Sequence, residues 1–430
     1  MRALLAAPRH DARTAGDAGA TGTHPEMTFF VPGRIEVLGK HTDYAGGRSL
    51  LAAVDRGIRV TAVARDHAGV TITDRRARER ITFPIDPALE IPAGWAAYPM
   101  TVARRLARNF PGPLRGADIT IASDLPEASG LSSSTALVIA CFLVLASVND
   151  LGATTPFTRN IGTLEELAAY LARVENGGRF RGLAGGDGVG TDGGAEDQIA
   201  ILCARPGEVL RYRFAPFEIE AVIALPADHV FAIACSGLRA EKAGAARGAY
   251  NRAAELTRIA ASIWRESSGR DDATLGEALA SGPQAAVTLR DAIAAARHTD
   301  ASAQELLDRV DQFNAETNEI IPAAAAALAG RDLERFGALV DRSHGLACTH
   351  LHNQVAETEH LARSARALGA VAASAFGAGF GGSVWALVPE AASAQFLEEW
   401  RARYIERFPV RAGDCEFFAS RAAGPAVRLS

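Results

Sequence analysis

The sequence predicts an α+β protein with two domains. Its 430 residues are more than one hydrophobic core usually holds, and 48% of them are hydrophobic, so the chain can fill two cores. Strand-like and helix-like segments alternate irregularly, without the strict β–α–β order of a doubly wound sheet. We place the domain boundary at residue 215, with an N-terminal domain over 27–215 and a C-terminal domain over 216–430.

The N-terminal domain is predicted to be rich in strands. An apolar run predicts a helix over about 133–148, and Thr163 with Glu166 three positions later forms a capping box that starts another helix ending near Glu175. A glycine-dense loop follows at 177–194. β-Branched and aromatic residues predict strands at 28–38 (interrupted by Pro32-Gly33), 58–64, 69–73, 80–84, 117–122 and 208–214.

The C-terminal domain is predicted to be mostly helical. Alanine-rich segments predict helices at about 241–266, 285–297, 301–328, 332–346 and 353–368. A strand, a glycine loop and a second strand are expected within 371–388, followed by a helix near 391–405. The remaining strands are predicted at 219–224, 230–235 and 415–421.

Composition and charge argue against several classes of protein. The net charge of −5 gives no attraction to nucleic acid or to an anionic membrane surface. No apolar run is long enough to span a bilayer, the best candidate being 136–148. The five cysteines show neither metal-ligand nor redox spacing, which predicts a cytoplasmic protein. Residues 1–26 are predicted to be a disordered tail, and we expect a monomer or a small homo-oligomer.

A strand, a glycine–serine loop and a helix follow one another around residues 125–135. The loop reads Leu-Pro-Glu-Ala-Ser-Gly-Leu-Ser-Ser-Ser-Thr. Gly130 lets the backbone come close to a ligand, while Ser132, Ser133 and Ser134 stand at the start of the helix. The free N–H groups and the positive dipole end there suit a phosphate group. An ordinary serine cap is the alternative, but three consecutive serines favour anion binding.

Two further loops match the pattern GxGxxG, and neither has the context of a dinucleotide site. The loop 377–382 precedes a strand, whereas a dinucleotide fingerprint opens a helix, so it is either a tight hairpin or a loop that abuts the phosphate loop. The loop 188–193 follows no strand and leads into Ala195–Gln198, where a flexible rim can present a carboxylate. A near match to Walker A at 33–40 fails, because His41 stands where Ser or Thr is needed.

Several ordered motifs together resemble the GHMP kinase superfamily and, within it, the galactokinases. Pro-Gly-Arg-Ile-Glu-Val-Leu-Gly-Lys-His-Thr-Asp-Tyr at 32–44 is similar to the galactokinase signature PGRxNLIGEHTDY. Trp95–Tyr98 resembles the element WxNY, 125–136 the phosphate-loop motif and 377–387 the third motif of the superfamily. Tyr-Asn-Arg at 250–252, Ser-His at 343–344 and the ending Ala-Ala-Gly-Pro at 422–425 stand in the same order.

The resemblance implies a fold and a reaction. The N-terminal domain is expected to be like the second domain of ribosomal protein S5, and the C-terminal domain to be ferredoxin-like. ATP and a sugar are expected to meet in the cleft between them, with Mg²⁺ as cofactor and the γ-phosphate passing to the anomeric hydroxyl. Phosphoryl transfer needs positioning and charge neutralisation more than covalent help, so few catalytic groups suffice.

The resemblance also assigns roles to individual residues. Asp197 matches the catalytic aspartate of the family motif MDQ, and Arg34 matches its basic partner. Ser134 (or its neighbour Ser133) and Glu175 match the Mg²⁺ ligands. The residues expected to bind sugar are Lys40, His41, Asp43 and Tyr250. The residues expected to bind ATP are Pro126, Ser129, Gly130, Leu131, Ser132, Ser133, Ser134, Gly379 and Gly381.

The chain departs from the galactokinase pattern at the presumed sugar site. Galactokinases carry Glu where Lys40 stands and Asn where Glu36 stands, and Lys40 is one of only two lysines in the chain. An ammonium group there would favour a carboxylate on the substrate, which leads to the hypothesis of a uronic acid such as galacturonate. Alternatively, Lys40 pairs with Glu36 or another acid and galactose still binds. The stretch from Glu175 to Asp197 is also about ten residues longer than in galactokinases, and it borders the same site.

Two other functions stay open on the sequence alone. Some galactokinase relatives bind ATP and sugar but act as sensors with impaired catalysis; the presence of Arg34, Ser134, Glu175 and Asp197 speaks against a sensor. A GHMP kinase for a non-sugar alcohol is the third possibility. The signature His-Thr-Asp-Tyr at 41–44 and the galactokinase-like ending weaken it.

Overall fold

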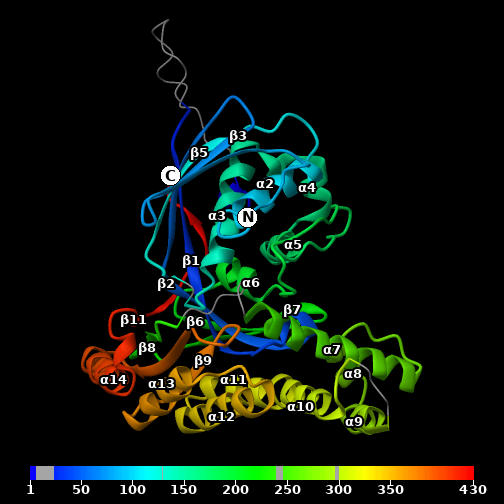
Figure 1. The fold of residues 1–430 in the computed structure, drawn as a ribbon, viewed down its shortest axis with the longest axis vertical. Coiled ribbons are helices and arrows are strands. Elements are labelled where there is room, and N and C mark those ends of the chain that lie inside the picture. Colours follow the sequence, from blue (N-terminus) through cyan, green and yellow to red (C-terminus); the bar gives the residue numbers. More distant parts are fainter. Residues whose placement is uncertain (6–23, 128, 239–245, 296–299) are drawn as a thin grey trace, which may run out of the picture.

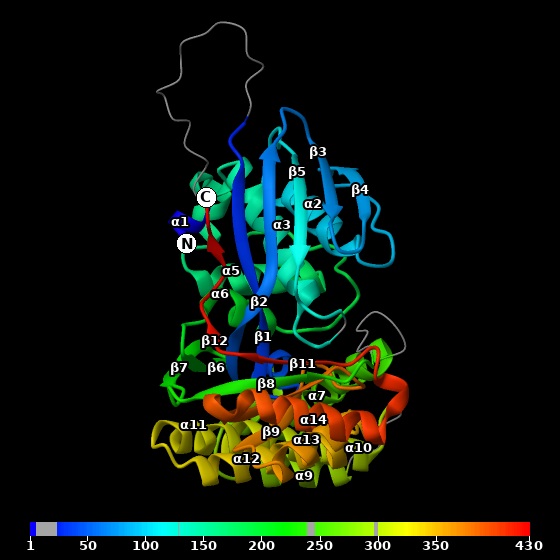
Figure 2. The same ribbon diagram turned by 90° about the vertical axis from the view of Figure 1, so that its left-hand side faces the viewer.

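The computed structural model describes residues 1–5, 24–127, 129–238, 246–295 and 300–430. They form an elongated molecule in which a strand-rich lobe stands on a helix-rich lobe, with β1 and β2 running from one into the other (Figures 1 and 2). Because helices and antiparallel strands are mixed without β–α–β repetition, the predicted α+β class is confirmed.

The first lobe is built on a nine-stranded sheet whose main path runs β13-β1-β2-β5-β3-β4, with β12 and β6 added against β2 and with β7 paired to β6. Among the strands of the described residues, β3 and β5 alone pair in parallel. The strands are β1 (Met27–Leu38), β2 (Arg48–Ala64), β3 (Gly69–Asp74), β4 (Glu79–Pro84), β5 (Ala117–Ser123), β6 (Glu208–Phe214), β7 (Phe217–Ala224), β12 (Ala422–Ala423) and β13 (Val427–Arg428). The helices are α1 (Arg2–Leu5), α2 (Ala97–Asn109), α3 (Ser133–Val148), α4 (Thr155–Asn160), α5 (Leu164–Asn176) and α6 (Glu196–Cys203).

The second lobe has a four-stranded antiparallel sheet in the order β11-β8-β10-β9. Its strands are β8 (His229–Cys235), β9 (Ala372–Phe376), β10 (Ser383–Pro389) and β11 (Glu416–Ser420). Its helices are α7 (Ala246–Ser268), α8 (Leu275–Ala280), α9 (Ala285–Ala295), α10 (Ala303–Asn314), α11 (Ile321–Ala329), α12 (Leu333–Leu346), α13 (Ala356–Ala367) and α14 (Ser393–Arg407). A π-helical segment, Ala315–Ile320, joins α10 to α11, so the single helix predicted at 301–328 is one continuous helical rod.

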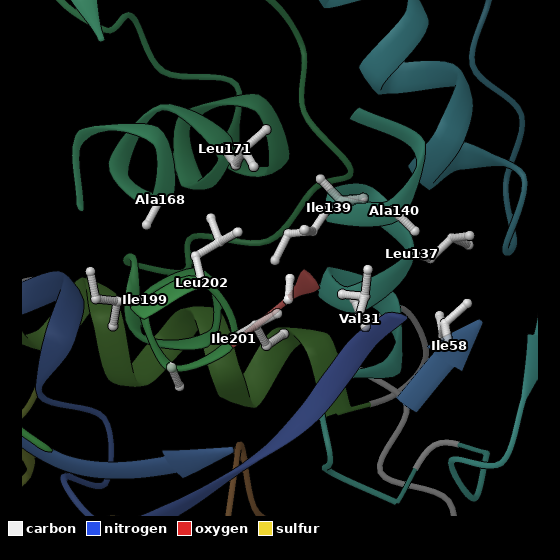
Figure 3. Close-up of a cluster of buried hydrophobic side chains, with 14 of the residues drawn as sticks. Val31, Ile58, Leu137, Ile139, Ala140, Ala168, Leu171, Ile199, Ile201 and Leu202 are labelled. Atoms are coloured by element: carbon white, nitrogen blue, oxygen red, sulfur yellow. The ribbon is translucent and has the colours of Figure 1, made fainter. Parts of the chain in front are cut away.

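Helix α3 forms the centre of the first lobe. Residues Thr135 to Val148 are all buried, as expected for a helix that is apolar on every side. Figure 3 shows Ile139 and Ala140 of this helix among Val31 of β1, Leu171 of α5 and Leu202 of α6. This packing fixes the N-terminal end of α3 relative to the start of α6, and the candidate site lies between those two points.

Most predicted elements are present, and the differences have local causes. Strand β1 continues through Pro32-Gly33, because a register shift against β2 accommodates the proline there. Helix α2 was not predicted; its first residues follow Ala96, whose side chain offers no cap. Strand β7 and the last strands β12 and β13 join the first sheet, so this sheet takes residues from beyond the predicted boundary at 215.

The N-terminal residues differ from the prediction of a disordered tail over 1–26. Residues 1–5 contain the short helix α1, and Leu5 is buried in the main core. Residues 24–26 lead directly into β1. Residues 6–23 lie outside the described part of the chain.

Candidate active site

A pocket lies where the two lobes meet, and almost every predicted catalytic or sugar-binding residue lines it. Strand β1 and the turn after it, the end of α5, the start of α6, α7 and the loop after β9 each contribute. The lining residues are Arg34, Glu36, His41, Asp43, Tyr44, Ala172, Glu175, Asn176, Thr191, Gly193, Gly194, Glu196, Asp197, Gln198, Tyr250, Gly377 and Ala378. The enclosed part of the pocket is small, about 40 Å³.

Arg34 and Asp197 form a buried ion pair in this pocket. Nε of Arg34 donates to Oδ1 of Asp197 at 2.7 Å, and Nη2 lies 2.5 Å from the same oxygen. Burial alone would lower the pKa of Arg34, but the charges of Asp197, Glu196 and Glu36 outweigh it and raise that pKa. The guanidinium therefore stays charged. Asp197 comes from the first turn of α6 and not from a flexible rim.

Arg34 also joins this pair to the predicted phosphate loop. Its Nη1 donates to the Gly130 carbonyl at 2.5 Å, and its backbone N–H donates to the Leu131 carbonyl at 3.2 Å. Gly130 has φ +81° and Ser132 has φ +59°, so the backbone winds tightly just before α3 begins. The Ser132 hydroxyl is buried, and it has no hydrogen-bond partner among the described residues. A ligand oxygen is the kind of partner it lacks.

Thr135, which directly follows Ser134, hydrogen-bonds to Glu175, the other predicted Mg²⁺ ligand. The Thr135 hydroxyl is 3.0 Å from Oε2 of Glu175 and 3.3 Å from Oδ2 of Asp197, so its one proton is shared between two carboxylates. Glu175 also accepts from Nε2 of Gln198 at 2.8 Å. Ser134 is half-buried and directly precedes Thr135. One carboxylate and one hydroxyl beside a phosphate loop are the oxygen donors that Mg²⁺ takes together with nucleotide phosphates.

The loop 377–382 abuts the phosphate loop, as one of the two sequence interpretations had it. The Ser383 hydroxyl donates to the Ser129 carbonyl at 2.6 Å. A Cβ added to Gly377 would lie 3.3 Å from the Gly130 carbonyl oxygen, which explains glycine there. Gly379 and Gly381 instead pack against Asn353 and Leu238. These two glycines therefore shape the loop rather than line a cavity.

A second cavity of about 610 Å³ opens on the other side of the phosphate loop. It holds Pro126 and Ser129 from the predicted ATP-binding set, and two arginines stand in its wall. The lining residues are Arg76, Pro126, Glu127, Ser129, Cys235, Gly237, Leu238, Gly382, Arg411, Asp414 and Glu416. A nucleotide whose phosphates lie at the start of α3 can place its remaining part in this cavity.

Three aromatic rings and Asp43 form the far wall of the pocket. Nε2 of His41 faces the Ala378 carbonyl at 3.0 Å, so Nε2 carries the proton in the neutral ring and Nδ1 accepts from the Tyr44 hydroxyl at 2.9 Å. Tyr250 lies 5.2 Å from His41, centroid to centroid. Burial raises the pKa of Tyr44 to about 12 and that of Tyr250 well above its usual range. Both phenols thus remain hydrogen-bond donors at neutral pH.

Three family descriptions match successive parts of the chain. They are the galactokinase galactose-binding signature over 19–64, the GHMP kinases N terminal domain over 97–204 and the GHMP kinases C terminal region over 324–406. A galactokinase of Chloroflexus aggregans is 30% identical over 404 residues, with 91% of this chain and 90% of that protein covered. The chain belongs to the GHMP kinases. Within them it is galactokinase-like, a phosphotransferase with an alcohol group as acceptor and ATP as phosphate donor.

Further relatives agree with this assignment. A galactokinase of Mycobacterium bovis is 32% identical over 372 residues, covering 84% of this chain and 89% of that protein. The crystal structure of Lactococcus lactis galactokinase complexed with galactose superposes with a TM-score of 0.75 at 22% identity, covering 94% and 95% of the two chains. A mevalonate kinase from L. major superposes with a TM-score of 0.56 at 14% identity, and this likeness concerns the fold alone. Among the residues described, no helix combines the length and the apolar character that crossing a membrane requires.

In this galactokinase-like kinase, Lys40 does not line the pocket, contrary to the sequence prediction. Its side chain is 1% exposed, and its ammonium lies 4.0 Å from a Glu36 carboxylate oxygen. With burial, its charge lowers the pKa of His344 to about 4. Lys40 is absent from the residues that line the pocket, and Glu316 of the π-helical segment accepts from the neighbouring Gly39 N–H at 2.8 Å. Direct substrate contact by Lys40 has no support in this geometry, and the alternative of a pair with Glu36 fits it.

Sequence reasoning missed several residues of this kinase site. Glu36 and Glu196 both line the pocket and are almost fully buried, and burial raises the pKa of each carboxyl. Glu196 stands where the motif MDQ has methionine and accepts from the Ser49 hydroxyl at 2.7 Å. A charged residue directly before the predicted catalytic Asp197 was the one sequence feature that could have indicated Glu196. Thr135 had no such signal, because its role appears only when α3, α5 and α6 are packed together.

Hydrogen bonds fix the long loop 177–194 to the first lobe. The Gly186 N–H donates to the Gly177 carbonyl, and the Val189 N–H donates to the Glu175 carbonyl at 2.8 Å. Arginine side chains of α2 donate to backbone carbonyl groups of the loop. For example, Nη2 of Arg104 donates to the Asp187 carbonyl at 2.7 Å. The loop ends beside the sugar-side wall. A Cβ on Gly194 would lie 2.4 Å from Oδ2 of Asp43, so only glycine allows this approach.

Proposed function

We propose that this kinase phosphorylates the anomeric hydroxyl of a neutral, galactose-like sugar ring. The observation that carries the proposal is the Arg34–Asp197 pair, which lines a pocket rich in hydrogen-bond acceptors. Arg34 also hydrogen-bonds to Gly130 of the phosphate loop. An aspartate so placed can orient a sugar hydroxyl and accept its proton as the new O–P bond forms. An anomeric hydroxyl is more acidic than other sugar hydroxyls, so a carboxylate base suffices.

Each partner of the pair has a distinct part in the transfer. Asp197 takes the proton of the attacking hydroxyl while the bond between the γ-phosphorus and the bridging oxygen of ADP breaks. Arg34 favours the ionised form of Asp197 and can stabilise negative charge on the transferred phosphoryl group. When Mg²⁺ is bound it neutralises phosphate charge, and Ser134 and Glu175 are the residues that would hold it.

The charges of the pocket favour a neutral ring over a uronic acid. The carboxylates that line it belong to Glu36, Asp43, Glu175, Glu196 and Asp197, while Arg34, already paired, is the one guanidinium among the lining residues. A carboxylate on the ring would meet a wall of acidic side chains without a free cation among the lining residues, in a place where burial already disfavours the ionised forms of Glu36 and Glu196. Sugar hydroxyls, in contrast, can donate to these oxygens. The uronic-acid hypothesis depended on Lys40 and loses its basis with the position of that side chain.

The proposal is tested by ADP release from the full chain with Mg-ATP. The panel holds galactose, L-arabinose, glucose, galacturonate and glucuronate, and ³¹P NMR of the product shows whether the phosphorus couples to the anomeric proton. We expect turnover of galactose or a related neutral sugar and a loss of about 1,000-fold in Asp197→Ala. Asp271→Ala removes an exposed carboxylate between α7 and α8 and serves as the matched control.

Three other results would change the assignment. Turnover of a uronic acid alone would refute the neutral-ring proposal while keeping the kinase. Phosphorylation at a hydroxyl other than the anomeric one would refute the 1-kinase assignment. ATP binding with no turnover of any sugar would support the sensor alternative.

A further inference from the structure

A third cavity continues the sugar pocket outward. It measures about 610 Å³, within the range of ordinary ligand pockets. It shares Asp43, Tyr44, Ala172, Asn176, Gly193 and Gly194 with the inner pocket. Its other walls come from the end of α5, the start of the long loop, the β6–β7 hairpin and α7, which lie on the same side of the molecule in Figure 1. We call this space the outer pocket.

The outer pocket has the opposite charge balance to the inner one. Four arginines line it against two carboxylates, the four being Arg173, Arg179, Arg181 and Arg258 and the two being Asp43 and Asp192. Arg181 pairs with Glu166 and Arg258 pairs with Asp192, each at 2.5 Å. In the described part of the chain, Arg173 and Arg179 form no ion pair and no side-chain hydrogen bond. Arg173 and Arg179, both exposed, therefore line this cavity without an acidic partner among the described residues.

The outer pocket also has room and surfaces for a second sugar ring. Phe180, Phe214 and Phe217 line it and are half-buried, so each offers part of an apolar face. A single carboxylate would need neither three aromatic rings nor a cavity of this size. Guanidinium groups with aromatic rings are a combination that recognises an extended anionic ligand.

The order of residues along the two cavities gives the orientation of the ligand. Asp197, which must reach the anomeric hydroxyl, lines only the inner pocket. Asp43 lines both, and Arg173 and Arg179 line only the outer one. The side of the ring opposite its anomeric carbon thus faces the outer pocket. A substituent there leaves the acidic inner pocket before it meets the arginines.

We propose that the preferred acceptor is an acidic disaccharide, with a neutral galactose-like ring at its reducing end in the inner pocket and a uronic acid unit in the outer pocket. This inference rests on the proposed function and extends it. Each unit of this disaccharide matches its pocket: the neutral reacting ring occupies the acidic inner pocket, and the unit with the carboxylate occupies the arginine-rich outer pocket.

The test compares matched pairs of disaccharides by their kcat/KM. Each pair places β-glucuronate or neutral β-galactose on O3, O4 or O6 of reducing galactose, with galactose itself as reference. For at least one linkage we expect the acidic member to be about tenfold better, and the advantage to shrink as salt rises from 50 to 300 mM. Arg173→Ala with Arg179→Ala should abolish that advantage and leave galactose turnover unchanged. Arg75→Ala with Arg80→Ala removes two exposed arginines near β4 and should change neither value.

Calorimetry with the same disaccharides gives a readout that does not depend on turnover. Wild-type chain should bind the acidic member about tenfold more tightly than the neutral one, and the Arg173/Arg179 double variant should bind both alike. Equal binding and equal kcat/KM for every pair, with galactose still phosphorylated, would overturn the acidic-disaccharide proposal alone. Preferential binding of the acidic member with no phosphorylation of any sugar would instead refute the proposed kinase function and keep the outer pocket as a binding site.

Discussion

Arg34 and Lys40 are both basic, both buried and both close to an acid, yet they serve different regions of the molecule. Arg34 points into the pocket and contacts Asp197 and the phosphate loop at 2.5–2.7 Å. Lys40 does not line the pocket; its ammonium is 4.0 Å from Glu36 and has no hydrogen bond to any described residue. Six positions apart in one motif, they differ in the surroundings of the side chain as well as in the geometry of the charged group.

The comparison shows why a charge change in a motif does not by itself define a substrate. Replacing a sugar-contacting glutamate by lysine suggested a carboxylate ligand, but the lysine is buried beside Glu36, and the neighbouring Gly39 N–H binds Glu316. A buried ion pair of this kind holds a region together only while both partners are present. Arg34–Asp197 is thus expected to affect the reaction, and Lys40–Glu36 the stability of the fold.

The largest effect is expected from Arg34→Lys, which keeps the charge but removes the planar fork. An ammonium cannot bind Asp197 and the Gly130 carbonyl in the same geometry, so kcat should fall by about 100-fold or more. The free energy of unfolding should change by only about 1 kcal/mol. Steady-state kinetics and urea unfolding measure the two quantities. A large loss of stability with normal kcat would reverse the roles assigned to the two pairs.

Lys40→Met should have the second largest effect, and it should be on stability. Removal of the ammonium leaves Glu36 and Glu316 buried beside each other, which should cost about 3 kcal/mol of unfolding free energy. Below the unfolding temperature, kcat and the KM for sugar should stay within about threefold of wild type. Lys40→Met with Glu36→Gln should recover part of the lost stability. If Lys40→Met instead raised the sugar KM strongly in a stable protein, Lys40 would belong to the substrate site after all.

The pH dependence of stability should reveal Glu36. Burial raises its pKa to about 7 against the opposing charges of Lys40 and Arg34, whereas the unfolded value is 4.5. Between these values the folded state holds a proton that the unfolded state has lost, so the unfolding free energy falls as pH rises from about 5 to 7, by up to about 1.4 kcal/mol per pH unit.

His344 acts in the opposite sense over part of this range, since its lowered pKa makes stability fall as pH drops below about 6.5. The difference between wild type and Glu36→Gln isolates Glu36. The unfolding free energy of wild type minus that of Glu36→Gln should fall as pH rises and level off above about pH 8. A difference that is flat from about pH 5 to 8 would remove the assigned proton from Glu36.

Thr135→Val should give the smallest effect, and it tests whether the Thr135 hydroxyl orients Asp197. The change removes the hydroxyl that lies between Glu175 and Asp197 while keeping the shape of the side chain. We expect kcat to fall about fivefold, because Asp197 loses one of the contacts that orient it. Thr101→Val, at a buried hydroxyl of α2 without a hydrogen-bond partner, is the matched control. Equal kcat in both variants would show that Thr135 only fills space.

The sequence predicted much of the fold because its elements carry local signals. The capping box of Thr163 with Glu166 opens α5 as expected, and the apolar run from Ser133 gives α3. Helix α2 begins without a polar cap, and the first half of β2 at 48–57 follows a glycine turn, so neither gave a comparable signal. The partner of β12 is about 370 residues away and that of β13 about 400, which no local pattern can indicate.

The site was predicted as far as motifs identify residue types. Arg34, His41, Asp43, Glu175, Asp197 and Tyr250 meet in one pocket. The burial of Lys40 was not predictable, since its surroundings include Glu316, which binds the neighbouring Gly39 N–H from 277 positions further along the chain. The outer pocket was also beyond local reasoning, because α5, the β6–β7 hairpin and α7 form it together.

The return of the last strands to the first sheet bears on how the chain folds as it is made. β12 pairs with β2 and β13 pairs with β1, so the strand-rich lobe lacks two strands until residues 422–428 have left the ribosome. The helical lobe is synthesised in between and can complete its own four-stranded sheet slightly earlier, at residue 420. A chain stalled just short of its end would therefore expose the edge of β1 to neighbouring nascent chains, and chaperone binding to such stalled chains would fall when β13 is released.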